Sequence, residues 1–168
     1  MGRSVVYFTD MRATPERNLL QKFRALIERA GIEDINFEKQ FTAIKIHLGE
    51  PGNIAYLRPN FAKVVADKVK ELGGKPFLTD SNTLYVGRRK DALEHLEAAY
   101  ENGYNPFCTG CHVVIADGLK GTDEALVPRQ WRRVYKGSED RPRDSRRRRD
   151  NLADALQGPR DNGLRRRD

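Results

Sequence analysis

Apolar residues follow two kinds of pattern along the first 128 residues. Short runs rich in Val, Ile, Phe and Thr predict β-strands, and they lie at residues 4–9, 41–48, 75–79 and 113–116. Longer segments between them repeat apolar residues at the spacing of an amphipathic helix, and they lie at residues 15–30, 59–72 and 90–102. Strand and helix alternate, which favours right-handed βαβ units. The sequence therefore predicts an α/β fold with a mostly parallel sheet.

The apolar stripes of two predicted helices indicate which side chains should face that sheet. In the first helix the stripe consists of Leu19, Leu20, Phe23, Leu26, Ile27 and Ala30. In the third helix the residues expected to point inward are Ala92, Leu93, Leu96, Ala99 and Tyr100. His95 lies at the border of this second stripe, and the pattern assigns it no role.

Polar residues follow the predicted strands at their carboxyl ends. Asp10, Asp80 and Asp117 come directly after strands, and the strand at residues 41–48 runs into the loop GEPGN. Ligands bind outside the carboxyl ends of the strands in open parallel sheets, so this edge predicts a site for a small polar ligand or a hard cation. The candidate ligand-binding residues are His47, Glu50, Asn53, Asp80, Asn82 and Asp117.

The acids of this set would serve as ligands or proton carriers, and His47 would be the titratable group. Two structural interpretations stay open beside the functional one. Asp and Asn also cap helices and close turns, and a histidine at a strand end is often a hydrogen-bonded structural group. The sequence assigns no residue as catalytic and none as a metal ligand.

The only two cysteines lie in the segment Cys-Thr-Gly-Cys-His at residues 108–112. The spacing matches covalent haem attachment, but the chain shows no export signal, and its two methionines offer few axial ligands. A redox pair or half of a zinc site stays open, although no second cysteine pair completes four ligands. Two structural thiols are the simplest interpretation, and no cofactor is expected in this chain.

Charge divides the chain at about residue 128. Residues 1–128 contain 17 basic and 17 acidic residues, whereas residues 129–168 contain 14 basic and 7 acidic residues. This Arg-rich tail lacks a periodic apolar face, so it is predicted to be disordered. If the tail is a native part of the protein, its arginines instead suggest a nucleic-acid-binding arm.

No apolar run is long enough to span a bilayer, and a cytoplasmic protein is expected.

Four segments carry a resemblance to a known family: KIHLGEPGN, YLRPN, FLTDSNTLYVG and HVVIADGLKG, at residues 45–53, 56–60, 77–87 and 112–121. In residue identity and in their order along the chain, these segments resemble the uncharacterised iron-sulfur-centre proteins, a family classified as a domain of unknown function. The resemblance covers nearly all of residues 4–128, and it implies the amino-terminal part of a larger domain. It also implies that full-length relatives continue into a ferredoxin-like domain that binds 4Fe-4S clusters.

The resemblance leads to a hypothesis about the tail. Relatives continue through the motifs HFKGH and GFGGA, which are absent here as written. The codons for residues 129–168 can be read in a frame that starts one nucleotide later. When the third bases, which the amino-acid sequence leaves open, are chosen suitably, this shifted frame encodes both motifs in the expected order. A frameshift at about residues 128–129 would therefore explain an incomplete sheet, an out-of-frame tail and a truncated product without activity. The predicted domains are residues 1–128 and the tail, residues 129–168.

Overall fold

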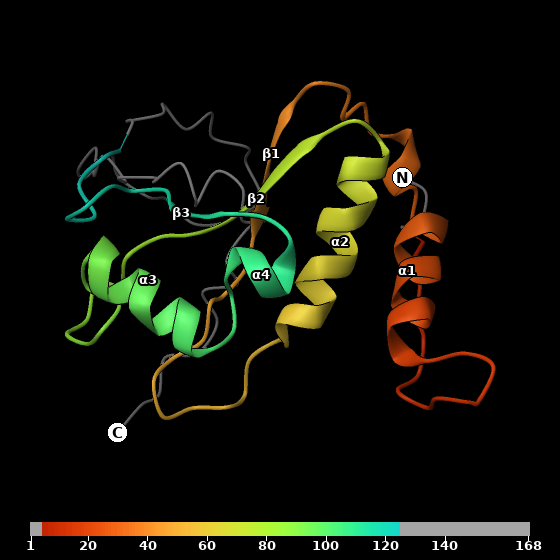
Figure 1. Cartoon of the computed structure of the whole chain (residues 1–168), viewed down its shortest axis with the longest axis horizontal. Helices are drawn as coiled ribbons and strands as arrows, with labels where there is room; N and C mark the ends of the chain where they lie inside the picture. The colour runs from red at the N-terminus through yellow and green to blue at the C-terminus, as the bar shows by residue number, and fades with distance from the viewer. Residues whose placement is uncertain (1–4, 125–168) are drawn as a thin grey trace, which may run out of the picture.

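A computed structural model describes residues 5–124 of the chain. The elements in chain order are α1 (Leu19–Arg29), η1 (Ile32–Asp34), β1 (Phe41–Lys45), α2 (Pro59–Glu71), β2 (Lys75–Asp80), α3 (Ala92–Glu101), α4 (Pro106–Thr109) and β3 (Val113–Ile115). The three strands form one parallel sheet in the order β1-β2-β3 (Figure 1). The predicted α/β class and parallel sheet are confirmed. Within residues 5–124 the sheet is small and open: it consists of these three strands, and β1 and β3 each leave one edge unpaired.

The register of the sheet brings the strand ends together. Lys45 at the end of β1 lies opposite Thr79 of β2, and Asp80 lies opposite Ile115 of β3. The carboxyl ends of the three strands therefore form one edge, as the alternation of strands and helices predicts. Every candidate site residue lies at the end of a strand or in the loop that follows it.

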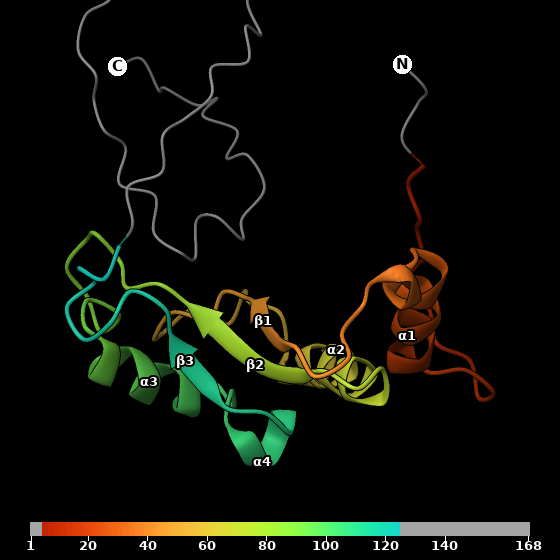
Figure 2. The ribbon, with the colours of Figure 1, turned by 90° about the horizontal axis from the view of Figure 1, so that it is seen from above.

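Helices α2, α3 and α4 lie on the same side of the sheet, and α1 stands beside α2 (Figure 2). The buried apolar cluster consists of Leu48, Ala62, Ala66, Leu78, Ala92, Ala99, Tyr104, Cys111 and Ile115. Many of the helix residues in this cluster are alanines, so the helices can approach the strands closely. Tyr104 anchors the loop after β1 to this cluster, because its hydroxyl donates to the carbonyl oxygen of Leu57.

The predicted strand at residues 4–9 is wrong over its described part, residues 5–9. Val5, Val6 and Phe8 are exposed, and Asp10 pairs with Lys22 of α1 instead of lining the sheet edge. Strand-forming side chains need a neighbouring strand and an apolar surface to cover. Among the described residues the sheet contains β1, β2 and β3 alone, so this run has no such surface.

Helix α1 packs mainly against α2 and not against the sheet, contrary to the sequence prediction. The rings of Phe23 and Phe61 meet edge to face with their centroids 5.4 Å apart. The Lys68 ammonium of α2 lies 2.8 Å from the carboxylate of Glu28 on α1. A neighbouring helix therefore supplies the apolar surface that the stripe of α1 requires.

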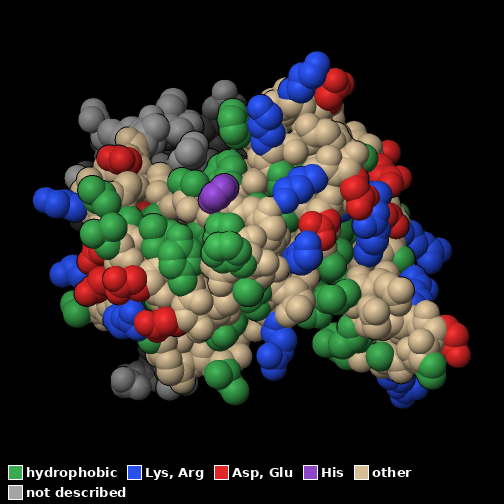
Figure 3. Space-filling model, viewed as in Figure 1, with side chains coloured by type: hydrophobic (Ala, Val, Ile, Leu, Met, Phe, Trp, Pro, Cys, Tyr) green, Lys and Arg blue, Asp and Glu red, His purple; other side chains and the backbone are tan. Residues whose placement is uncertain are grey.

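The inward face of α3 is also different from the predicted one. The buried residues are Ala92, His95, Ala98 and Ala99, whereas Leu93 and Tyr100 are exposed. Apolar side chains gather on the outer surface around α3 and α4 (Figure 3), and Phe107 of α4 is exposed there as well. The small side chains face the sheet because they allow close packing, and the inward position of His95 follows from this orientation.

The predicted disordered tail, residues 129–168, lies outside the described residues, and so does Ser4. The nucleic-acid-binding alternative depends on that tail and stays a prediction. Among the helices of residues 5–124, none is long and apolar enough to cross a bilayer.

Candidate functional site

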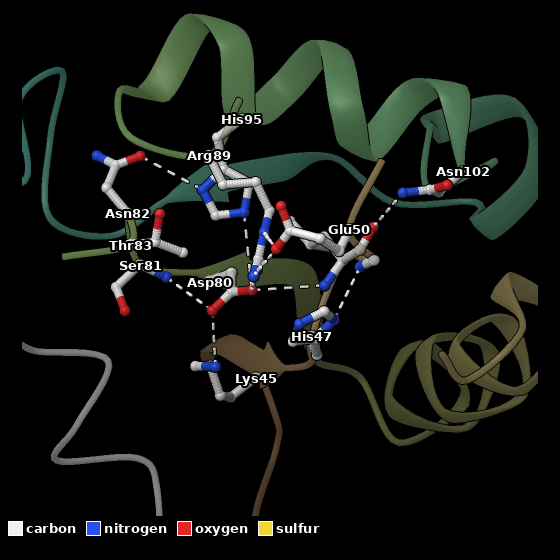
Figure 4. A network of polar contacts seen from close by, with 12 residues as sticks. Lys45, His47, Glu50, Asp80, Ser81, Asn82, Thr83, Arg89, His95 and Asn102 are labelled. Atoms are coloured by element: carbon white, nitrogen blue, oxygen red, sulfur yellow. Dashed lines mark hydrogen bonds and ion pairs between the residues drawn. The ribbon is translucent and has the colours of Figure 1, made fainter. Parts of the chain in front are cut away.

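Asp80 is the centre of a polar network under the carboxyl edge of the sheet (Figure 4). One carboxylate oxygen, Oδ1, lies 2.8 Å from Lys45 Nζ and accepts the Ser81 backbone N–H at 2.9 Å. The other oxygen, Oδ2, faces Arg89 Nη1 at 3.6 Å and His95 Nε2 at 3.7 Å. Asp80 is buried, so these contacts replace the water that an exposed carboxylate would have.

The protonation of Asp80 follows from these contacts. Burial by itself would raise the pKa of its carboxyl group, because it disfavours the charged form. Contacts with His95 and Lys45 and the Ser81 amide outweigh burial and lower the pKa of Asp80 to about 2. Asp80 is therefore a carboxylate at neutral pH, with cationic groups held around it.

Glu50 joins this network through Arg89. Its Oε2 atom accepts from the Tyr85 hydroxyl at 2.7 Å and from Arg89 Nε at 2.8 Å. The hydrogen bond from Tyr85 and the charge of Arg89 lower the pKa of Glu50, and the Glu50 carboxylate raises the pKa of Tyr85. Arg89 is buried and lies between the two acids, so it links Glu50 to Asp80.

A tight turn fixes the backbone around Glu50. The Asn53 backbone N–H donates to the Glu50 carbonyl oxygen at 2.9 Å, which closes the segment Glu-Pro-Gly-Asn. Gly52 has a φ of +83°, the value that the third residue of a type II turn requires, and Pro51 occupies the preferred second position. The sequence GEPGN therefore specifies the loop geometry that presents Glu50 to Arg89.

Asn82 connects Asp80 to Asp117 at the end of β3. The Asn82 backbone N–H lies 3.0 Å from both carboxylate oxygens of Asp117, which is buried. The Asn82 side chain donates from Nδ2 to the Gly118 carbonyl oxygen at 2.9 Å, and its Oδ1 lies 3.3 Å from His95 Nδ1. The residues after β2 and β3 are thereby held in one arrangement.

His47 lies at the exposed margin of the network. Its Nδ1 accepts the Gly49 backbone N–H at 3.0 Å. Partial burial and the positive charge of Arg89 lower the pKa of His47, so the ring is neutral at pH 7. Because Nδ1 accepts, the single ring proton resides on Nε2. His47 therefore presents an N–H donor at the edge of the sheet.

The structure brings most of the candidate residues together and leaves one apart. Glu50, Asp80, Asn82 and Asp117 belong to one network, with His47 beside it. The exposed Asn53 instead stabilises its own loop, because its side chain accepts the Ala55 backbone N–H at 2.8 Å.

Sequence reasoning missed four members of the network: Lys45, Tyr85, Arg89 and His95. The placement of Lys45 could have been found, because it ends a strand beside Asp80. The inward position of His95 was readable only from the alanines that share its helix face. Nothing in the local pattern distinguishes the buried Arg89 from the neighbouring Arg88.

The two cysteines lie in different surroundings and do not by themselves supply the ligands of a cluster. Cys111 is buried in the apolar core, where burial raises the pKa of its thiol, and Cys108 is exposed on α4. A cluster with four thiolates cannot be built from the two cysteines of this sequence. Within residues 5–124 no group of three or more His, Cys, Asp or Glu side chains is arranged to hold a metal ion.

The fold and the network define the molecule as an α/β domain with a buried ionic centre at its strand ends. A family profile described as "Domain of unknown function (DUF362)" matches residues 42–139, and the chain belongs to this family. The match begins at β1 and includes all candidate site residues. It also extends past the predicted domain boundary at residue 128. No curated protein and no solved structure gives a significant match.

Proposed function

We propose that this chain binds a small, acceptor-rich anionic molecule at the carboxyl edge of its sheet. The observation that carries the proposal is the arrangement of donors and acceptors at this edge. The oxygens of Asp80 and Glu50 already accept from Lys45, Arg89, Tyr85 and backbone amides. His47 offers a free Nε2–H, and the ammonium of Lys45 has more protons than its contact with Asp80 uses.

A hard cation is a poorer match to the same geometry. Ca²⁺ and Mg²⁺ are bound by several oxygen ligands, and carboxylates that face the ion supply the negative charge. The carboxylates of Asp80 and Glu50 are compensated by Lys45 and Arg89, and a metal would have to displace these cations. An anionic group can instead approach Lys45 and His47 without breaking either ion pair.

Binding can be tested with a defined set of probes and an exposed site residue. We expect succinate or inorganic phosphate to shift the ring signals of His47 in NMR titrations, whereas Mg²⁺ at the same ionic strength should not. His47→Gln should weaken binding of the anion about tenfold, because one hydrogen bond to a charged group is lost. The fold should be retained, because the His47 side chain lies at the surface.

His112→Gln is the matched control, since His112 is also exposed but precedes β3 at the opposite edge of the sheet. Its binding constants should equal those of the unsubstituted chain. Equal weakening by both substitutions would show non-specific binding, and a response of His47 to Mg²⁺ alone would favour a cation. Either result would contradict the proposal.

We also propose, from the resemblance in sequence, that full-length relatives couple this site to 4Fe-4S clusters and that this chain lost the continuation through a frameshift. The cysteines of this chain do not fit a cluster, so no electron-transfer step is assigned to it. Sequencing the coding DNA tests the frameshift. We expect one inserted or deleted nucleotide near codons 128–129, and an intact frame in relatives that share the Arg-rich tail would refute it.

A further inference from the structure

His95 is fully buried on the inward face of α3, yet neither the sequence pattern nor the proposed ligand site uses it. Its two ring nitrogens face two different oxygen atoms. Nδ1 lies 3.3 Å from Asn82 Oδ1, and Nε2 lies 3.7 Å from Asp80 Oδ2 (Figure 4). The identity of these two atoms determines how many protons the ring carries.

The partner of Nδ1 is fixed by the hydrogen bonds of Asn82. Its Nδ2 group donates to the Gly118 carbonyl oxygen at 2.9 Å, and a carbonyl oxygen can only accept. The amide of Asn82 therefore cannot be turned over without losing this bond and placing two acceptors together. Its Oδ1 atom must face His95, so Nδ1 of His95 carries a proton.

The partner of Nε2 is a carboxylate. Nε2 is buried and has no hydrogen-bond partner among the described residues. An unprotonated Nε2 would place its lone pair beside Asp80 Oδ2 at 3.7 Å, a separation too short for a bridging water, which is unfavourable in a buried site. A proton on Nε2 turns the same contact into an ion pair that closes by a small movement.

The charges around His95 favour the second proton. The groups that face it are Asp80 from β2 and Arg89 from the loop before α3, with Lys45 behind Asp80 and Asp117 behind Asn82. Glu50 completes the network through Arg89. Of these groups, the Asp80 carboxylate is the one whose contact with the buried ring nitrogen is shown, and it is ionised at neutral pH. An imidazolium at His95 would pair with this carboxylate, and buried charges are tolerated when they are paired.

We propose that His95 is a buried imidazolium that positions Asp80 and Asn82 beneath the sheet edge. The two ring protons bind the acceptors that follow β2, and His95 thereby ties α3 to the candidate site. Asp80 in turn holds Lys45, so the proton on His95 also determines where that ammonium lies. This inference concerns the unliganded protein and does not depend on the nature of the ligand.

The protonation state can be measured directly by NMR on the full 168-residue chain with ¹⁵N-labelled histidine rings. The sequence contains three histidines, and His47→Gln and His112→Gln assign the signals. At pH 7 we expect both ring nitrogens of His95 to carry protons, whereas His47 should carry one, on Nε2. A His95 ring with a single protonated nitrogen at pH 7 would overturn the proposal, whatever the variants do.

A substitution tests whether Asp80 is the counter-charge. Asp80→Asn removes the negative charge beside Nε2, and we expect His95 to lose one ring proton while Nδ1 stays protonated. Asp67→Asn is the matched control, because Asp67 pairs with Lys63 on the surface of α2 and should leave His95 unchanged. A doubly protonated His95 in folded Asp80→Asn would contradict the ion pair. The unsubstituted chain decides the proposal if this variant does not fold.

Discussion

Asp80→Asn is expected to lower the free energy of unfolding by about 3 kcal/mol, one of the two largest effects among the substitutions considered. The asparagine has nearly the same shape, so the loss comes from charge and not from packing. The carboxylate of Asp80 compensates Lys45 and faces Arg89, and both of these cations are shielded from water. Urea denaturation followed by circular dichroism measures the change.

Asp67→Asn provides the comparison for this measurement. Its ion pair with Lys63 joins two partly exposed side chains one turn apart on α2, and such pairs contribute less than about 0.5 kcal/mol. The two variants therefore remove the same charge from a buried and an exposed position. Equal losses of stability would show that the network around Asp80 does not stabilise the fold.

The same carboxylate should make stability depend on pH in the acid range. The pKa of Asp80 is lowered from 3.8 to about 2 in the folded chain, so the folded state binds its proton less readily than the unfolded state does. Its contribution, about 2 kcal/mol, is present above pH 4 and is lost as the pH falls through 2. The difference in unfolding free energy between the unsubstituted chain and Asp80→Asn should shrink over this interval.

The sequence predicted the features that local patterns encode. All three strands of the sheet fall on segments that were predicted to be strands, and Asp80 and the Asp117 region mark where strands end. The polar edge of the sheet follows from the parallel arrangement alone. The loop GEPGN after the second predicted strand is also present, and the structure adds that it forms a type II turn, with proline and glycine in the positions that such a turn prefers.

What the sequence could not reveal depends on contacts between distant segments. Arg89 is buried because Glu50, 39 residues earlier, supplies its counter-charge. His95 points inward because α3 presents its alanines to the sheet, which leaves Leu93 exposed. Residues 5–9 have the composition of a strand but lack a neighbouring strand. In each case tertiary packing overrides the local preference.

Gly49→Ala is the second substitution with a large expected effect, a loss of about 3 kcal/mol in unfolding free energy. Gly49 has a φ of +92°, which an L-residue adopts only with strain. A Cβ atom at this position would also collide with the side-chain amide of Asn102, whose Cγ lies 2.8 Å away. This amide donates to the Leu48 carbonyl oxygen at 3.1 Å and so ties the end of α3 to the loop after β1.

Two further variants separate backbone strain from the collision. Gly52 has a φ of +83° but open space where its Cβ would lie, so Gly52→Ala should lose only about 1 kcal/mol. In an Asn102→Ala background the colliding amide is absent and only the Cβ of residue 102 stays close, at 3.3 Å, so Gly49→Ala should then have nearly the same small effect as Gly52→Ala. A double-mutant cycle in urea measures this coupling. An additive result would mean that the Asn102 side chain does not contribute to the requirement for glycine at position 49, and that backbone strain alone accounts for it.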